Sequence, residues 1–457
     1  MFHYLKEKFQ TARLKARYER LMQERLLALA EGGPQPVAED PGQWLLLGAG
    51  GNRLNEQERI DARTRARRMV IQNPHAANML RLMEIYVTGP GLMVNAVPAW
   101  PGDSERDQKI AEVADHVWSE FLMKNREHFS YREHARRTWR DGECFLRLFA
   151  DSADGPTVRF LDPETIGDTK EHPGSHGILT DASDVERRVA YLRIDPKTGE
   201  LSERIPAESI LHTRINADSN QKRGLTWFNP VLETLGQFDR WLETTLIARK
   251  LQASIVLWRK VTGAAEDSSI VADVGERGPI YDNGSIIPRE KYRAGTILTT
   301  SEGTDLQYLH PTTNFRDGVP LGRLMLLCTA AGTGLPEYML TSDASNANYA
   351  STLVAEGPAV KLFHSEQQFF AGEWERLWRW VLSLHVAKGN LPEETFERIE
   401  PEWTFPNLAA RDRPRERQAD VRLASAGIIS KAEVARRDNA DPRLMRAEIA
   451  LERSGAK

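Results

Sequence analysis

Residues 224–260 read GLTWFNPVLETLGQFDRWLETTLIARKLQASIVLWRK. The interpretation of the rest of the chain starts from this segment. Asn229-Pro230 is a helix start signal, because asparagine is a capping side chain and the fixed φ of proline suits a first helical turn. Apolar residues then recur every three or four positions, which draws one stripe along a helix: Val231, Leu235, Phe238, Leu242 and Leu246. A β-rich run follows at residues 255–258. The pattern predicts an amphipathic helix that feeds a strand, a unit that any large domain can contain.

The composition is that of a large folded protein. The 457 residues exceed one compact core, and at roughly 150 residues per domain they indicate two or three parts. Two cysteines, Cys144 and Cys328, provide no disulfide framework and fit a reducing cytoplasm. Met1 opens a charged helix rather than a signal peptide, and the longest apolar run, residues 324–331, is too short to span a bilayer. We therefore expect no membrane association.

The first 223 residues alternate helical and extended patterns. Residues 1–31 predict a basic helix, followed by a breaker-rich linker at 32–43. Its charges fit a solvated peripheral helix, and contact with nucleic acid or a partner is the alternative. Helices are predicted at residues 56–72, from Asn73-Pro74 to about Tyr86, and at 104–124 and 130–140. Strands are predicted at 92–94, 144–149, 158–161, 190–194 and 210–213, with a tight turn at 195–199.

Two helices frame a turn-rich excursion after the opening segment. In residues 256–312, Asp282-Asn283-Gly284 stands between two β-rich pairs, which is a strong hairpin signal. The second helix is expected within residues 315–332 and carries Arg323. Pro320 either starts that helix late or kinks it.

Small polar residues precede a long helical pattern in the last third of the chain. Residues 341–348 carry no positive charge and can be read as an ordinary capped turn. In the helix that follows, Gly357-Pro358 predicts a kink, with two separate helices as the alternative. The C-terminal region predicts two or three helices, broken at Gly427 and at residues 439–442.

Five phrases of this sequence, taken in order, resemble the lambda-type family of portal proteins of tailed phages. They are ARRMVIQNPHAANMLRLMEIYVTGPGLMV, HFSYREHARRTWRDGECFLRLF, VRFLDPETI, RGLTWFNPVLETLGQFDRWLETTLIARKLQAS and GLPEYMLTSDASNANYAS. The similarity extends from the first Asn-Pro helix to near the C-terminus. It contains no catalytic motif, so its specificity rests on length and order.

The resemblance implies an α+β subunit of a closed, dodecameric ring. Its expected parts are an N-terminal basic helix and linker (1–43), a mixed wing (44–223), a first stem helix (224–255), a strand-rich clip (256–313), a second stem helix (314–333), a tunnel loop (334–348), a kinked long helix of the wing and inner ring (349–400) and a crown-like helical region (401–457). We expect the clip to match the family in position and character only.

The resemblance also assigns roles to particular residues. The DNA channel is expected to be lined by tunnel-loop residues Thr341, Ser342, Asp343, Ser345, Asn346 and Asn348. The stem is expected to use Pro230, Leu235, Phe238, Leu242 and Arg323. The helix kink is expected at Gly357 and Pro358, and the clip hairpin at Asp282, Asn283 and Gly284.

A search for chemical motifs predicts no catalytic residue, no metal site and no cofactor. Residues 48–52 lack the lysine and hydroxyl of a phosphate-binding loop. The histidines form no HExxH pair, His172 and His176 lie in a loop read as surface, and neither cysteine belongs to a CxxC motif. The alternative function is a nucleic-acid-processing enzyme such as a nuclease, which would need clustered carboxylates.

The expected partners follow from the resemblance. They are further copies of this chain, double-stranded DNA that passes through without sequence-specific binding, the terminase large subunit, head–tail connector or neck proteins, and major capsid and scaffolding proteins. The net charge of −4 argues against a tight DNA binder but suits a conduit, because a wall that gripped phosphates would stop the polymer. The expected location is the capsid vertex of the virion, with assembly in the host cytoplasm. A relative in a gene-transfer particle would carry the same signals.

Overall fold

The computed structural model describes residues 56–454, except 91, 100–104, 151–154, 182, 185, 261–270, 273–277, 283–284, 290–295, 301–314, 344, 346–348, 409–412 and 439. The predicted N-terminal helix and linker therefore lie outside the described residues. The chain divides into Met1–Leu54 and Asn55–Lys457, and the description below concerns the second unit. Helices and strands are mixed along it, and among the described residues none of the five small sheets closes into a barrel.

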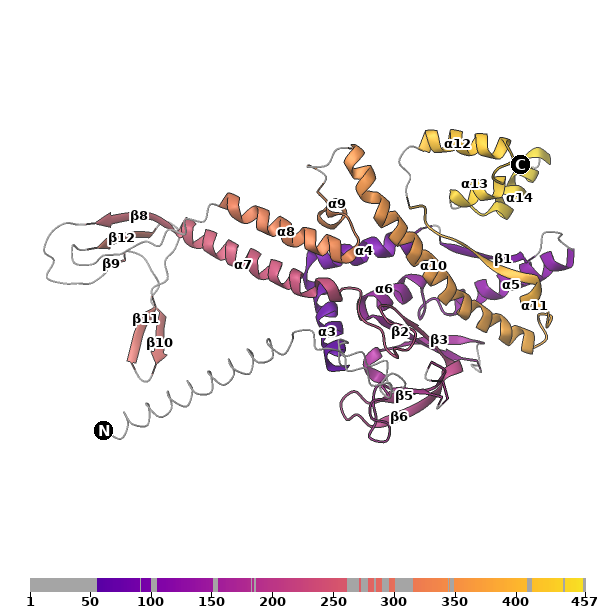
Figure 1. Cartoon of the computed structure of the whole chain (residues 1–457), viewed down its shortest axis with the longest axis horizontal. Helices are drawn as coiled ribbons and strands as arrows, with labels where there is room; N and C mark the ends of the chain where they lie inside the picture. The colour runs from indigo at the N-terminus through magenta and orange to yellow at the C-terminus, as the bar shows by residue number, and fades with distance from the viewer. Residues whose placement is uncertain are drawn as a thin grey trace, which may run out of the picture. The chain divides into compact units, whose positions relative to one another are not determined.

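Two consecutive helices open the described chain (Figure 1), and both were predicted. Helix α3 spans Glu56–Gln72 and α4 spans Pro74–Thr88. The Asn73 side chain between them accepts a hydrogen bond from the backbone N–H of Ala76, and Pro74 occupies the first helical position. Asn73 is thus the N-cap that the Asn-Pro pair predicted.

A two-stranded sheet joins the beginning of the described chain to its last third. Strand β1 (Met93–Pro98) pairs antiparallel with β13 (Ile399–Thr404). Helix α5 (Glu105–Lys124) packs on both strands. The predicted strand at residues 92–94 covers only the start of β1. Strand β13 was not predicted, because its sequence IEPEWT has no long apolar run.

The predicted wing contains two three-stranded antiparallel sheets. Helix α6 (Tyr131–Asp141) ends at Gly142 with φ +88°, and the chain then enters β2 (Glu143–Phe149). Strand β2 lies between β3 (Thr157–Leu161) and β7 (Ile210–Arg214). The second sheet has the order β4 (Ile178–Thr180), β5 (Arg188–Ile194), β6 (Leu201–Pro206). Short 3-10 turns, η1 (Pro163–Thr165) and η2 (Ala207–Ser209), follow β3 and β6.

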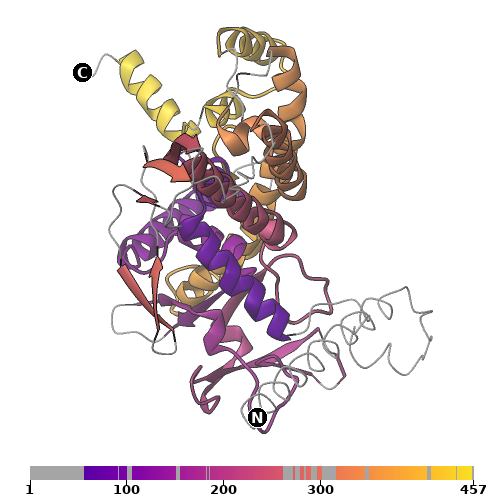
Figure 2. The ribbon, with the colours of Figure 1, turned by 90° about the vertical axis from the view of Figure 1, so that its left-hand side faces the viewer.

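Helices α7 (Leu232–Ser254) and α8 (Phe315–Thr333) pack side by side (Figures 1 and 2). Between them, β8 (Ile255–Lys260) and β12 (Thr296–Thr300) run parallel, with β9 (Val271–Ala272) on the other side of β12. Strands β10 (Gly278–Asp282) and β11 (Ser285–Arg289) form a separate antiparallel hairpin that pairs Ile280 with Ile287. The predicted hairpin strands are confirmed, whereas Asn283 and Gly284 lie outside the described residues.

Two details of the helix starts differ from the prediction. Asn229 does not cap α7, because residues Asn229–Val231 form the 3-10 turn η3. The Thr226 hydroxyl instead accepts the backbone N–H of Phe228. Pro320 lies inside α8, which begins at Phe315, so a late start of that helix is wrong.

The last third is built on one long helix. After α9 (Glu337–Thr341), helix α10 spans 39 residues, Tyr349–Ala387, and continues without interruption past Gly357 and Pro358. Two separate helices are therefore ruled out. Next come α11 (Thr395–Arg398), α12 (Arg413–Ser425), α13 (Lys431–Arg437) and α14 (Pro442–Ser454). The breaks at Gly427 and around residues 439–442 are where they were predicted.

Helix α10 supplies side chains to both large core clusters of the described residues. Phe363, Phe370 and Trp374 pack with α3, α4, α6 and η3 in one cluster. Further along the helix, Trp378 and Val381 pack with α5, β2 and β13 in the other. Burying large aromatic and aliphatic side chains on successive turns stabilises both clusters, so α10 joins them into one core.

Candidate functional site

The predicted channel segment begins at the end of the short helix α9. The Thr341 hydroxyl donates to the backbone carbonyl of Glu337 at 2.8 Å and accepts the N–H of Asp343 at 3.2 Å. Ser342 adopts the left-handed conformation with φ +57°, which turns the chain out of the helix. The Asp343 carboxylate then accepts the N–H of Ser345 at 2.8 Å, and the side chain and the backbone N–H of Ser345 together hold the pKa of Asp343 below its usual value.

The side chains that continue from this turn face solvent. Ser342, Asp343 and Ser345 are exposed, while Thr341 is half-buried at the base. Asn346 and Asn348 lie outside the described residues. The structure thus agrees with a capped turn in its first residues, which was the alternative to a tunnel loop, and the two interpretations share this geometry.

Helix α9 is held in place from several sides. Met339 and Leu340 are buried in the core. Arg323 on α8 donates through Nε and Nη2 to the two carboxylate oxygens of Glu337, at 2.7 and 2.9 Å. Such a two-pronged contact fixes direction as well as distance, so Arg323 ties α8 to α9, the helix before the predicted channel residues.

The apolar stripe of α7 changes its environment along the helix. Val231, Leu235 and Phe238 are buried, whereas Leu242 and Leu246 are 42% and 52% exposed. One stripe therefore packs in the subunit's own core near the helix start and emerges from it beyond Phe238. Pro230 is exposed in η3, beside a close approach to α8 where a Cβ on Gly332 would lie 2.7 Å from Val231.

Helix α8 also presents apolar side chains to solvent. Its contact with α7 uses glycine, because a Cβ on Gly322 would lie 2.6 Å from the ring of Trp241. Elsewhere on α8, four apolar side chains are between 41% and 55% exposed: Val319, Leu321, Leu324 and Leu327. With Leu242, Leu246 and Ile247 of α7 they make up a set that we call the stem stripe. Several exposed apolar side chains gathered on one helix pair are typical of an interface.

A buried ionic cluster at the loop that precedes η3 was not predicted. Glu143 at the start of β2 is completely buried and accepts from Arg223 and Arg59 at 2.7 and 3.0 Å. Burial alone would raise the pKa of Glu143, but these guanidinium groups hold it well below its usual range. Arg223 also donates to the carbonyl oxygens of Pro163, Ile166 and His176. Removing one member of such a cluster costs about 3–5 kcal/mol, so Glu143 fixes the loop that precedes η3 and α7.

A second buried network connects α10 to α6 and β7. Trp374 Nε1 donates to His134 Nδ1 at 2.9 Å, and His134 Nε2 lies 3.0 Å from the Thr213 hydroxyl. Thr213 donates in turn to Glu373. Because Nδ1 accepts, the neutral ring must carry its proton on Nε2. Burial lowers the pKa of His134 to about 3, which keeps the ring neutral.

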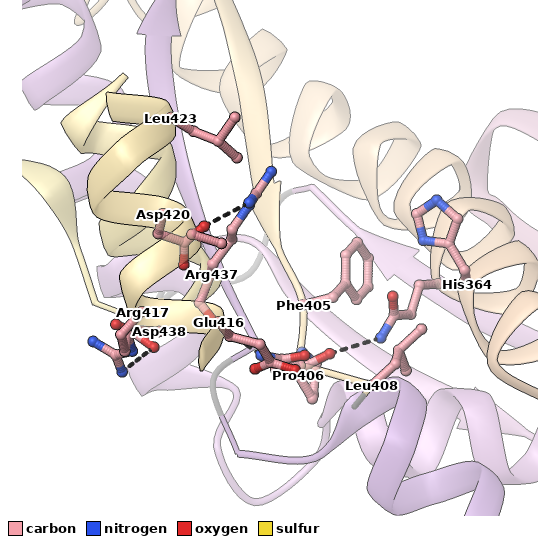
Figure 3. A pocket seen from close by; sticks show the side chains of 13 residues that line it. His364, Phe405, Pro406, Leu408, Glu416, Arg417, Asp420, Leu423, Arg437 and Asp438 are labelled. Carbon is pink, nitrogen blue, oxygen red and sulfur yellow. Dashed lines mark hydrogen bonds and ion pairs between the residues drawn. The ribbon is translucent and has the colours of Figure 1, made fainter. Parts of the chain in front are cut away.

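A cavity of about 650 Å³ lies between α10, the segment after β13, and helices α12 and α13 (Figure 3). Its charged walls are paired, Arg437 with Asp420 at 2.9 Å and Arg417 with Asp438. Across the described ranges, no group of three His, Cys, Asp or Glu side chains is placed to hold a metal ion. No helix there is both long and apolar enough to cross a membrane.

The remaining predicted residues are distributed between two elements. Gly357 and Pro358 are exposed within the N-terminal half of α10, and the predicted bend there stays a prediction. Asp282 is the last residue of β10 and pairs with Ser285. The contact between Arg323 and Glu337 thus joins α8 to α9, at whose end the residues predicted to line the channel begin.

Sequence comparison identifies the class to which this arrangement belongs. Residues 41–367 match the family model of phage portal proteins, lambda family. The match covers more than half of the chain, and the chain therefore belongs to the lambda family of phage portal proteins, with a portal protein's role at a capsid vertex of the virion.

Solved structures of particle components are similar to the chain over most of its length. One is from the neck of an empty GTA particle computed with C6 symmetry, at 16% identity, with 90% of this chain and 97% of that chain covered and a TM-score of 0.45. Another is from the virion of a native gene transfer agent (GTA) particle, at 14% identity, the same coverages and a TM-score of 0.41. A third, from the neck of the native particle computed with C12 symmetry, has 13% identity, again the same coverages, and a TM-score of 0.40.

Proposed function

We propose that copies of this chain assemble head to tail into a closed ring of about a dozen subunits around a DNA channel. The stem would comprise residues 224–255 and 314–333, the wing 44–223, the clip 256–313, the tunnel loop 334–348, the inner-ring helix 349–400 and the crown 401–457. The stem stripe carries this proposal, because α7 and α8 leave it uncovered in one subunit. A neighbouring copy that packed on it would remove these side chains from water, which is the main driving force for association.

The channel role is proposed for the turn after α9. Its described residues, Ser342, Asp343 and Ser345, are exposed, polar and free of positive charge. Phosphate groups bind Lys and Arg with release of counterions, so a wall without these residues does not hold the polymer. This supports a conduit for double-stranded DNA that makes no sequence-specific contacts.

We further propose that the clip docks the terminase large subunit and the neck proteins, and that capsid and scaffolding proteins contact the outer ring during assembly in the host cytoplasm. The ring itself has no enzymatic activity in this proposal and takes no cofactor. The energy for DNA movement then comes from the separate packaging motor. A metal-dependent nuclease activity of the purified ring would contradict this part.

The ring predicts a specific assembly defect. Leu246→Glu places a charge on the stem stripe, where burial against a neighbour would strip its water, so rings should fail to form while the subunit stays folded. Native mass spectrometry and electron microscopy of the purified protein measure this directly. Wild-type protein should give closed rings of about a dozen copies without nucleotide or metal.

Leu201→Glu is the matched control, because Leu201 on β6 is similarly exposed, at 45%, but lies in the wing. This variant should form normal rings. A wild-type protein that stays monomeric at micromolar concentration, or normal rings with Leu246→Glu, would contradict the proposal.

A further inference from the structure

The N-terminal turn of α4 touches both the first stem helix and the helix that carries the channel segment. Asn73 Nδ2 donates to the Asp239 carboxylate on α7 at 2.8 Å. The ring of His75 meets Phe238 of α7 edge-on, with 5.5 Å between centroids. One turn further along, Asn78 points its amide at α9. These contacts link α7 to α9 through α4, although the three helices are far apart in sequence.

Asn78 satisfies backbone groups at the end of α9. Its Nδ2 donates to the carbonyl oxygens of Met339 and Leu340 at 2.8 and 3.1 Å. The last carbonyls of a helix have no partner within the helix, and they determine how the chain leaves it. The next residues are Thr341 and the left-handed Ser342, so Asn78 acts at the point where the chain turns toward solvent.

We propose that Asn78 is a positioning residue that sets the direction of the segment after Thr341, with Arg323 as a second brace on the opposite end of α9. Asn78 holds the C-terminal carbonyls, and Arg323 holds Glu337 in the first turn. A single-turn helix has too few internal hydrogen bonds to resist a lateral force alone. The proposal rests on the proposed function only in that this segment is the one that meets DNA.

The motion of a spin label tests the proposal without any DNA. Ser345→Cys provides the attachment site in the full-length chain, and Cys328→Ser removes the exposed native thiol. Cys144 is buried, which raises the pKa of its thiol and keeps it unreactive. The label should be restricted on the otherwise unchanged protein. Asn78→Ala should raise the mobile fraction of the electron paramagnetic resonance spectrum about twofold or more.

Asn407→Ala is the matched control, because Asn407 Nδ2 also donates to the last carbonyl of a helix, that of Arg437 in α13. Thermal unfolding recorded in parallel separates local loosening from loss of fold. If Asn78→Ala does not fold, Arg323→Gln removes the exposed brace instead and should also raise the mobile fraction. An unchanged spectrum in whichever of these variants folds, or an equal change with Asn407→Ala, would overturn the proposal.

A packaging assay separates this inference from the proposed function. A mobile label together with slower DNA packaging by intact Asn78→Ala rings supports both. A mobile label with packaging at the wild-type rate supports the positioning role of Asn78 and refutes the channel role of the segment.

Discussion

His134 makes the stability of the fold depend on pH. Its pKa is lowered to about 3 because it is buried, whereas the unfolded ring takes up a proton near pH 6.5. Between these values the unfolded state binds more protons, so stability is present above about pH 6.5 and is lost as pH falls. His212, also buried with its pKa lowered to about 3, acts in the same direction.

We predict that unfolding free energy falls by about 2 kcal/mol from pH 7 to pH 5 through His134 alone. His134→Gln keeps an acceptor and a donor for Trp374 and Thr213 but cannot be protonated. It should lower stability at pH 7 and reduce the pH dependence by that amount. Denaturant titrations at both pH values measure this, and His172→Gln in an exposed loop is the control. An identical pH slope in His134→Gln and wild type would contradict it.

Single residues were predictable where the signal is local. Asn73 was predicted as a cap because Asn-Pro acts on its own next few residues. The same pair predicted a cap wrongly at Asn229, because residues Asn229–Val231 form the 3-10 turn η3. The Thr226 hydroxyl accepts the N–H of Phe228 there instead. Glu143 could not be predicted, since its partners Arg59 and Arg223 lie 84 and 80 residues away.

At the scale of elements, the hairpin β10–β11 stands apart from its neighbours. Its strands pair with each other, whereas β8, β9 and β12 form a different sheet. Strand β8 of that sheet follows α7 directly, and β12 is its last strand before α8. Deleting residues 278–289 therefore removes one sheet and leaves the other intact.

We predict that this deletion, closed with a short Gly-Ser linker, preserves rings but abolishes binding of the packaging ATPase and of neck proteins. Ring formation is checked by electron microscopy, and binding by co-sedimentation with each partner. Rings that disappear while the isolated subunits remain folded would show that the hairpin belongs to the ring's own interface.

Long helices were predicted better than short strands. The periodic patterns of α3, α7 and α10 indicated helices, because each buries a face over several turns, although α7 begins at Leu232 and α10 ends at Ala387. Strands β4, β6 and β13 were missed, since three to six residues of mixed polarity pair only with partners that the sequence does not reveal. That residues 334–348 line a channel stays a prediction. The contact of Asn78 with the end of α9 was not predicted, because nothing in residues 334–351 points to Asn78.

For the whole assembly, the proposed channel predicts that the charge of its wall affects how DNA moves. Asp343→Lys would place one new cation per subunit around the polymer. In a closed ring these charges act together on successive phosphates, and each contact releases condensed counterions. We therefore predict normal rings and capsid incorporation, with DNA packaging that is slowed or arrested at low salt and recovers as ionic strength rises.

Two controls separate charge from local structure. Asp343→Asn keeps an acceptor for the N–H of Ser345, and Asp343→Gln changes the turn without adding charge. Both should package normally at every salt concentration. Packaging rates are measured across an ionic-strength series, and a wild-type rate for Asp343→Lys at low salt would refute the channel assignment.

The division of the α7 stripe into a buried and an exposed half separates two events in time. Leu235 and Phe238 join the core of their own subunit, so the helix can be anchored before any neighbour arrives. In the proposed ring, Leu242 and Leu246 would be covered only when another copy binds, at a rate that depends on how many folded subunits are present. In a cell, the number of portals would then depend on the concentration of folded subunits rather than on the rate of folding. A low level of synthesis would be enough to keep that number small.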